Sequence, residues 1–114
     1  MNLLETYNDH SLSTEEKEYL CDIQYEVWHL LGETGIREDK DVTSVVVWAS
    51  GLYSGVFNDD YDLVGLGKSL LCVEVTITFL NRPPERDIKL VERGDTALIG
   101  AAVETLVKNI INHN

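Results

Sequence analysis

Residues 71–79 read LCVEVTITF, and this stretch decides the fold. Large apolar side chains stand at every second position, which is the period of a β-strand with one face against a core. The β-branched residues in the stretch also favour extended backbone. Pro83 and Pro84 end the pattern, because proline cannot donate to a strand ladder. The stretch therefore predicts a half-buried strand near the middle of the chain.

Two amphipathic helices are predicted, one on each side of this strand in the sequence. Ser13 and Glu16 have the spacing of a capping box, so the first helix begins there. Gly32 or Gly35 can end it, and residues 94–96 offer a cap for a C-terminal helix. Apolar residues recur at helical spacing in both segments. They are Leu20, Ile23, Val27, Leu30 and Leu31 in the first, and Leu98, Ile99, Ala102, Val103, Leu106, Val107, Ile110 and Ile111 in the second.

Residues 42–57 fit two patterns. The triplet 45–47 with Trp48 favours a strand, whereas a helical stripe behind an Asp41 cap fits the same apolar positions. Because β-branched side chains lose rotamer freedom in a helix, we favour two short strands separated near residues 50–51. Periodicity alone leaves the helix open as the alternative.

The expected fold class is α+β, in one acidic domain that spans residues 1–114. Residues 1–12 are polar and are expected to form a loose N-terminal lead-in, and residues 87–92 can form one more short strand. The predicted order is α-β-β-β-β-α. This order gives an antiparallel sheet of about three to four strands with an N-terminal and a C-terminal amphipathic helix packed on it.

The excess negative charge lies in the first half of the chain. The whole sequence has 20 acidic and 9 basic residues and a formal net charge of −11. Residues 1–62 contain 14 of the acids and three of the bases, whereas residues 63–114 contain six of each. A field of this sign repels nucleic acids and anionic lipids and attracts basic partners. We therefore expect a basic protein partner and no direct nucleic-acid or membrane binding.

The cysteines and the first residues indicate a cytoplasmic protein. Residues 1–5 show no basic region before an apolar run of signal-peptide length, and no apolar stretch is long enough to span a bilayer. Cys21 and Cys72 form neither a disulfide framework nor a CxxC metal pair.

Motifs of known enzyme sites are incomplete. Residues 67–69 match the GK[ST] end of a phosphate-binding loop, but Asp62 stands where the first glycine is required. Cys21 and His29 lie about 12 Å apart along a helix, too far for a nucleophile and its base. No histidine pair has zinc-ligand spacing. We expect no catalytic residues, cofactor or metal; an enzyme whose residues come from distant segments remains an alternative.

A short acidic turn partly resembles a calcium loop. Asn58, Asp60 and Asp62 copy its first three ligand positions, but Leu63 replaces the turn glycine, so an EF-hand is excluded. Whether Asp59, Asp60 and Asp62 hold a cation in an improvised site stays open. A solvated turn is the simpler interpretation.

Five acidic residues follow the polar side of the first helix. At 100° per residue they fall within about 60° of one line, with His29 in the same stripe. Like charges at this spacing cost a few tenths of a kcal/mol per pair, so the helix gains no stability from them. Tyr25 and Trp28 border the row and are residue types that concentrate binding energy in interfaces. The row, here called the acidic ridge, consists of Glu15, Glu18, Asp22, Glu26 and Glu33.

These features lead to the hypothesis of a small, non-enzymatic binding protein that blocks a basic surface of another macromolecule, such as a nuclease or a nucleic-acid-binding protein. A row of carboxylates imitates phosphates, and phage inhibitors of host defence and immunity proteins of toxin systems use the same logic. The expected contacts are the acidic ridge, Tyr25 and Trp28 as anchors, and Asp59, Asp60 and Asp62 as a second acidic patch. A solvated face with ordinary core aromatics is the alternative for the ridge.

A second hypothesis is a homo-oligomer, such as a homodimer, that binds a small ligand between sheet and helix. Glycines beside the central strands would let a ligand approach the backbone closely. A pocket lined by Trp48, Tyr53 and Tyr61 would favour this hypothesis. The glycines are Gly51, Gly55, Gly65 and Gly67.

Overall fold

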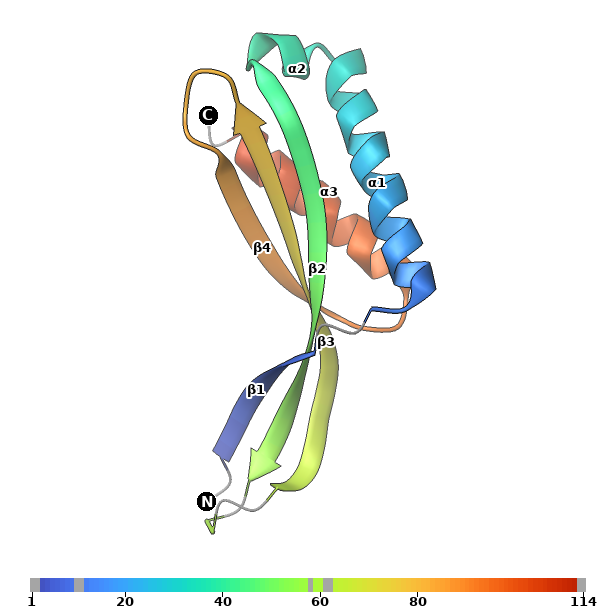
Figure 1. Ribbon diagram of the computed structural model, residues 1–114, viewed down its shortest axis with the longest axis vertical. Coiled ribbons are helices and arrows are strands. Elements are labelled where there is room, and N and C mark those ends of the chain that lie inside the picture. The colour runs from blue at the N-terminus through green and yellow to red at the C-terminus, as the bar shows by residue number, and fades with distance from the viewer. Residues whose placement is uncertain (1–2, 10–11, 58, 61–62, 113–114) are drawn as a thin grey trace.

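The computed structural model (Figure 1) has a four-stranded antiparallel sheet with helices on one face, so the predicted α+β fold class is confirmed. The structure describes residues 3–9, 12–57, 59–60 and 63–112. The elements are β1 (Leu3–Asp9), α1 (Thr14–Glu33), α2 (Ile36–Asp39), β2 (Val42–Phe57), β3 (Leu63–Phe79), β4 (Glu85–Glu92) and α3 (Thr96–Asn112). Within these ranges no helix has the length and apolar character needed to cross a bilayer.

The sheet has two halves that share the long strands β2 and β3. In one half, residues 42–50 of β2 pair with the end of β3, which also pairs with β4, and the helices cover these strands. In the other half, β1 pairs with residues 51–57 of β2. Figure 1 shows this second half projecting away from the helices as an arm. The radius of gyration is 17.0 Å, against about 13 Å for a compact domain of this length, so the arm makes the molecule elongated.

The alternation in β3 builds the core. Val73, Val75 and Ile77 have no exposed surface, because they face the helices. α1 packs over β2, and α3 packs over β3 and β4. Ile99, Val103 and Leu106 of α3 close the core from the other side. The predicted strand at residues 71–79 is therefore confirmed, and it continues back to Leu63.

The predicted start of the first helix is confirmed in detail. The Ser13 hydroxyl accepts from the Glu16 backbone N–H at 3.1 Å, and the Ser13 N–H donates to the Glu16 carboxylate at 2.9 Å. α1 ends at Glu33, and Gly35 then adopts a left-handed φ of 79°, which glycine accepts without strain. The short helix α2 follows this turn. The predicted strand at residues 87–92 is also present, as β4.

Two expectations are wrong. Residues 42–57 form one strand rather than two, because the pairing with β3 runs without a register shift from Ser44 to Tyr53, straight through residues 50–51. Residues 3–9 form β1 rather than part of a loose lead-in, because the arm half of β2 offers a free edge to which their backbone pairs. The chain order is therefore β-α-α-β-β-β-α.

Candidate functional site: the outer side of α1

The acidic ridge lies on the solvent side of α1. Its five residues are exposed, whereas Leu20, Val27 and Leu31 on the opposite side are buried in the core. Within the part of the chain that the structure describes, no hydrogen bond or ion pair joins a ridge carboxylate to a basic side chain. The outer side of α1 therefore carries a row of negative charges without an internal counter-charge.

The described basic side chains with assigned contacts do not touch the ridge carboxylates. Arg86 pairs with Glu74 on the sheet, and Lys108 pairs with Glu104 on α3. Arg82 lies over the ring of Phe79. Arg93 and Arg37 do reach α1, but they contact Glu16 and Trp28 rather than a ridge carboxylate. The negative potential of the ridge is therefore left for solvent or a partner to neutralise.

Glu16 is the one buried acidic residue of α1, and it belongs to the scaffold rather than to the ridge. The Arg93 guanidinium donates to both of its carboxylate oxygens, at 2.8 Å and 3.0 Å. This hydrogen bonding to Arg93 holds the pKa of Glu16 below its usual range, although burial alone would raise it. The pair ties the start of α1 to the end of β4. Sequence reasoning found the cap but missed Arg93, which lies 77 residues away in the chain.

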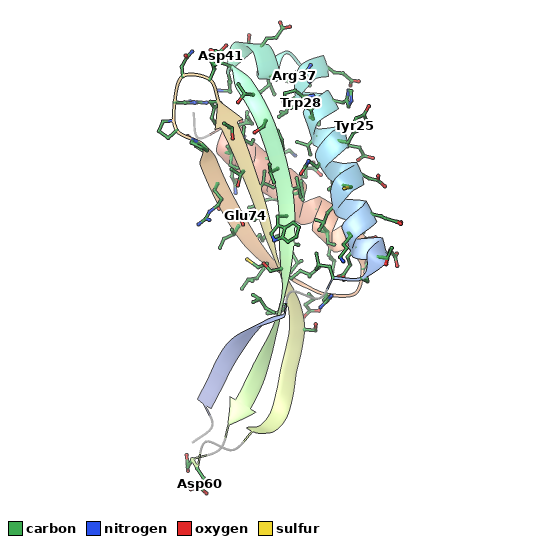
Figure 2. All side chains as sticks on the ribbon, viewed as in Figure 1. Tyr25, Trp28, Arg37, Asp41, Asp60 and Glu74 are labelled. Carbon is green, nitrogen blue, oxygen red and sulfur yellow. The ribbon has the colours of Figure 1, made fainter. Side chains whose placement is uncertain are left out.

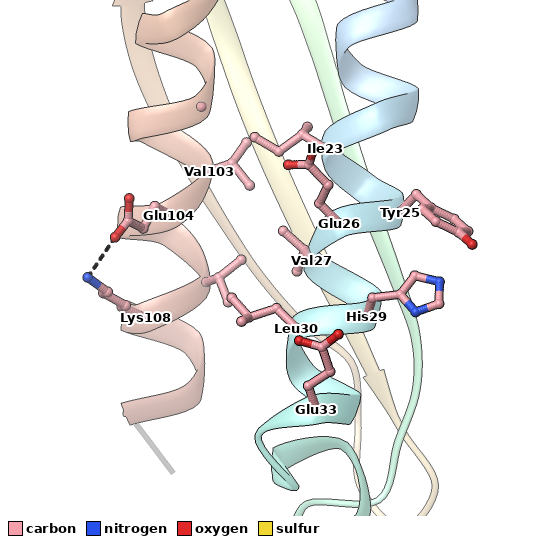
Figure 3. A pocket seen from close by; sticks show the side chains of 12 residues that line it. Ile23, Tyr25, Glu26, Val27, His29, Leu30, Glu33, Val103, Glu104 and Lys108 are labelled. Atoms are coloured by element: carbon pink, nitrogen blue, oxygen red, sulfur yellow. Dashed lines mark hydrogen bonds and ion pairs between the residues drawn. The ribbon is translucent and has the colours of Figure 1, made fainter.

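A groove opens between α1 and α3, directly beside the ridge (Figure 3). Its volume is about 580 Å³ and its lining is mainly apolar. Leu30 is the most accessible apolar residue of the lining, at 56% exposed. Glu26 and Glu33 of the ridge lean from α1 toward the groove in Figure 3, and Glu104 lies on the opposite rim. The apolar lining residues are Ile23, Val27, Leu30, Val103 and Val107.

The sequence analysis did not find this groove, because it assigned Leu30 to the core. Leu30 lies at the edge of the apolar stripe of α1, next to the acidic side, and such an edge position is the only local signal of partial exposure. Whether it is buried depends on the separation of α1 and α3, which no local pattern encodes.

The two predicted anchors both line a hollow between α1 and the start of β2, but they differ in how open they are to a partner. Tyr25 is 66% exposed and is one of the residues that line the groove, although its ring extends away from α3 in Figure 3. The centre of this ring lies 4.2 Å from that of His29, and the two rings are tilted by 57°. Trp28 is half-buried, and the Arg37 guanidinium lies 4.3 Å from the centre of its ring (Figure 2). Arg37 also donates to the Trp28 carbonyl at 3.4 Å. Tyr25 is thus open to a partner, whereas one side of the Trp28 ring is already covered.

The second acidic patch is not brought near the ridge. Asp59 and Asp60 are exposed at the tip of the arm, at the opposite end of the molecule from α2 (Figure 2). Asp62 and Asn58 lie outside the described residues. Among the side chains that the structure does describe, no group of three histidines, cysteines, aspartates or glutamates is arranged to hold a metal ion.

The pocket expected for a small ligand is not seen as such. Trp48 is 54% exposed and lies on the sheet face that the helices leave open, opposite Glu74 of β3. The side chain of Tyr53 and the whole of Tyr61 lie outside the described part of the structure. The described aromatic of this trio therefore faces away from the space between sheet and helix.

Comparisons with protein-family models, with curated proteins and with solved structures found no match to this chain.

Proposed function

We propose that this chain is a small, non-enzymatic binding protein that covers a basic surface of another macromolecule with the outer side of α1. The observation that carries the proposal is the acidic ridge, five exposed carboxylates in one row without a basic partner among the described residues. Lysines and arginines of a partner would supply the missing counter-charges. Complementary charges of this kind raise the rate of association and fix the orientation of a complex.

The stability of α1 gives a reason for Glu15, which lies in the first turn and suits the helix dipole, but not for the other four ridge residues. Like charges three or four residues apart in a helix repel one another. The last turn of α1, all of which the structure describes, contains no basic residue, and Glu33 lies at the negative end of the helix dipole. The cation near this end is Arg37, which follows α1 in the chain and donates to the Trp28 carbonyl. A row that costs stability and neutralises nothing inside the molecule is better explained by an interaction outside it.

The groove adds an apolar contact next to the charges. A partner segment with one or two apolar side chains between basic residues would place the apolar groups against Leu30 and the basic groups against Glu26 and Glu33. Desolvated apolar anchors supply most of the binding energy in such interfaces, and the charged rim supplies specificity. We infer that ridge and groove act together on one basic, partly apolar surface.

The favoured partner is a nuclease or another nucleic-acid-binding protein. From Glu15 to Glu26 neighbouring ridge residues are spaced about 4.5–6 Å along the helix axis, and Glu33 follows after about 10.5 Å. The shorter spacing is of the same order as the about 3.4 Å rise per phosphate of a DNA strand. A surface built to receive phosphates would therefore accept the ridge, and its nucleic-acid site would be blocked. An immunity protein or an inhibitor of a defence nuclease would act in this way.

The test is affinity capture from a lysate of the source cells with the immobilised chain, at about 0.05 M and 0.5 M salt. Screening shortens the reach of exposed charges, so we expect basic proteins to be retained at low salt and released at high salt. Glu18→Lys with Glu26→Lys should abolish the capture.

The matched control is Asp59→Lys with Asp60→Lys, which changes the net charge equally at the tip of the arm. This variant should retain the partner with at most a modest loss. Capture that survives high salt, or that both double variants lose equally, would contradict a role for the ridge.

A further inference from the structure

The face of the sheet opposite the helices carries an exposed apolar patch. In Figure 1 α3 passes behind the upper sheet, and no described helix covers the face turned to the viewer. Four apolar side chains on this face are each about half exposed. The open-face patch consists of Val46 at 48%, Trp48 at 54%, Ile88 at 54% and Leu90 at 55%.

The strand registers make these side chains one surface. Trp48 stands opposite Glu74, which stands opposite Ile88. Cys72, in the next row on the same face, stands opposite Leu90. Because paired residues in an antiparallel sheet project to the same side, the apolar side chains of β2 and β4 share one face. Between them β3 contributes Cys72, Glu74 and Thr76, so the two apolar edges of the patch flank a partly polar strand.

The open face is almost neutral, in a molecule whose net charge is −11. Its described charged residues are Glu74, Arg86 and Glu92, and the first two pair with each other at 3.3 Å. By contrast, the acidic ridge on the outer side of α1 contains five acids and no lysine or arginine. The remaining described polar residues on this face are uncharged, namely Ser44, Ser50, Thr76 and Thr78.

We propose that the open-face patch is the interface with a second copy of this chain, in a two-fold symmetric dimer. A partner as acidic as this chain is repelled by α1 and meets the least repulsion at the neutral face. A two-fold interface must be complementary to itself, and this face contains apolar groups together with the acids Glu74 and Glu92 and the base Arg86. Tryptophan is among the residues that contribute most to such contacts.

The dimer is expected to be reversible. Three strands of about seven residues cover about 14 by 23 Å of sheet. The area of this rectangle is well below the about 800 Å² per partner of a standard interface. Sheets that pack face to face bury this kind of surface in a layer about 10 Å thick. Because the helices lie on the other side of each sheet, the two acidic ridges would point away from each other, and each could hold its own partner.

The test is the molar mass in solution, measured by sedimentation from about 1 to 200 µM. We expect a transition from 12.8 kDa to twice that mass, and Trp48→Glu should remain at the monomer mass throughout. Tyr25→Glu replaces another exposed aromatic, on α1, and should dimerise like the original chain. Leu90→Glu repeats the disruption at a second position, and circular dichroism shows whether each variant is folded.

Salt separates this interface from the partner site. Raising salt from about 0.05 to 0.5 M screens the repulsion between two acidic copies, so dimerisation should strengthen, whereas partner capture through the ridge should weaken. A chain that stays monomeric at 200 µM in high salt, or a Trp48→Glu variant that still dimerises, would overturn the dimer. If the chain stays monomeric but captures basic proteins, only the dimer proposal is contradicted. If the chain dimerises but captures no basic protein, the dimer proposal stands and the proposed function is contradicted.

Discussion

The outer side of α1 and the open face of the sheet are both exposed to solvent, but their exposed side chains differ in charge and polarity. On α1 carboxylates face out and most apolar side chains are turned to the core, although Tyr25 and Leu30 are exposed beside the carboxylates. On the open face apolar side chains remain exposed and the few charges are nearly balanced. The two sides therefore differ in charge: α1 offers apolar surface bordered by acids, whereas the sheet offers apolar surface that is nearly neutral, so each side suits a partner of different chemistry.

The largest predicted effect on stability is expected in the core between the sheet and the helices. Ile77 is fully buried, and Ile88 is 54% exposed on the open face. Ile77→Ala should lower the free energy of unfolding by about 2–5 kcal/mol because it leaves a cavity, whereas Ile88→Ala should cost less than about 1 kcal/mol. Urea denaturation below the concentration of dimer formation measures both. Equal losses would show that the open face is packed against something.

The next effect concerns two carboxylates of α1 that face opposite ways. Glu16→Gln should cost about 2 kcal/mol, because it replaces the hydrogen-bonded charge pair with Arg93 by a neutral contact. Glu18→Gln, the same substitution on the ridge, should leave stability unchanged or slightly raised, since it removes a repulsion. Denaturation at pH 7 tests both variants.

The pair with Arg93 also predicts a pH dependence. Because the folded pKa of Glu16 is lowered, its contribution is complete above the pKa of an unfolded glutamate, about 4.3, and is lost as pH falls through the folded value. The stability difference between the original chain and Glu16→Gln should therefore shrink below about pH 4. A difference that stays constant to pH 2 would mean that the carboxylate charge is not what stabilises this contact.

A third effect concerns the contact between α1 and the edge strand β2 of the helix-covered half of the sheet. β1 does not reach the helix-covered half of β2, and the Gln24 side chain of α1 accepts from the Val47 N–H at 2.8 Å. Gln24→Leu should cost about 1–2 kcal/mol, because the N–H loses its acceptor in a partly buried place. Gln24→Glu keeps an acceptor there and should cost less. The order of the two variants in thermal unfolding checks the assignment.

Local patterns predicted the parts of this molecule that depend on near neighbours. The capping box at Ser13, the alternation of residues 71–79 and the outward direction of the acidic ridge all follow from spacings of two to four residues. Each confirmed feature needs only the geometry of one helix or one strand. The role of the ridge in binding remains a prediction.

Features that join distant segments could not be predicted in the same way. β1 exists because residues 3–9 pair with residues 51–57, and their polar composition gives no strand signal. Arg93 meets Glu16 only after β4 and α1 are in place. The groove depends on the distance between α1 and α3, and the open-face patch depends on which face of the sheet the helices cover. Neither feature can be predicted from short sequence patterns.

The smallest expected effect separates stability from function on α1 itself. Glu33 lies in the last turn, where a positive charge suits the helix dipole, so Glu33→Lys should raise stability by about 0.3–1 kcal/mol. Glu15 lies in the first turn, and Glu15→Lys should lower stability by a similar amount. Both variants change the ridge charge equally, and both should weaken capture of a basic partner. If Glu33→Lys stabilises the fold but leaves capture unchanged, the groove end of the ridge lies outside the interface, and the partner binds nearer to Glu18.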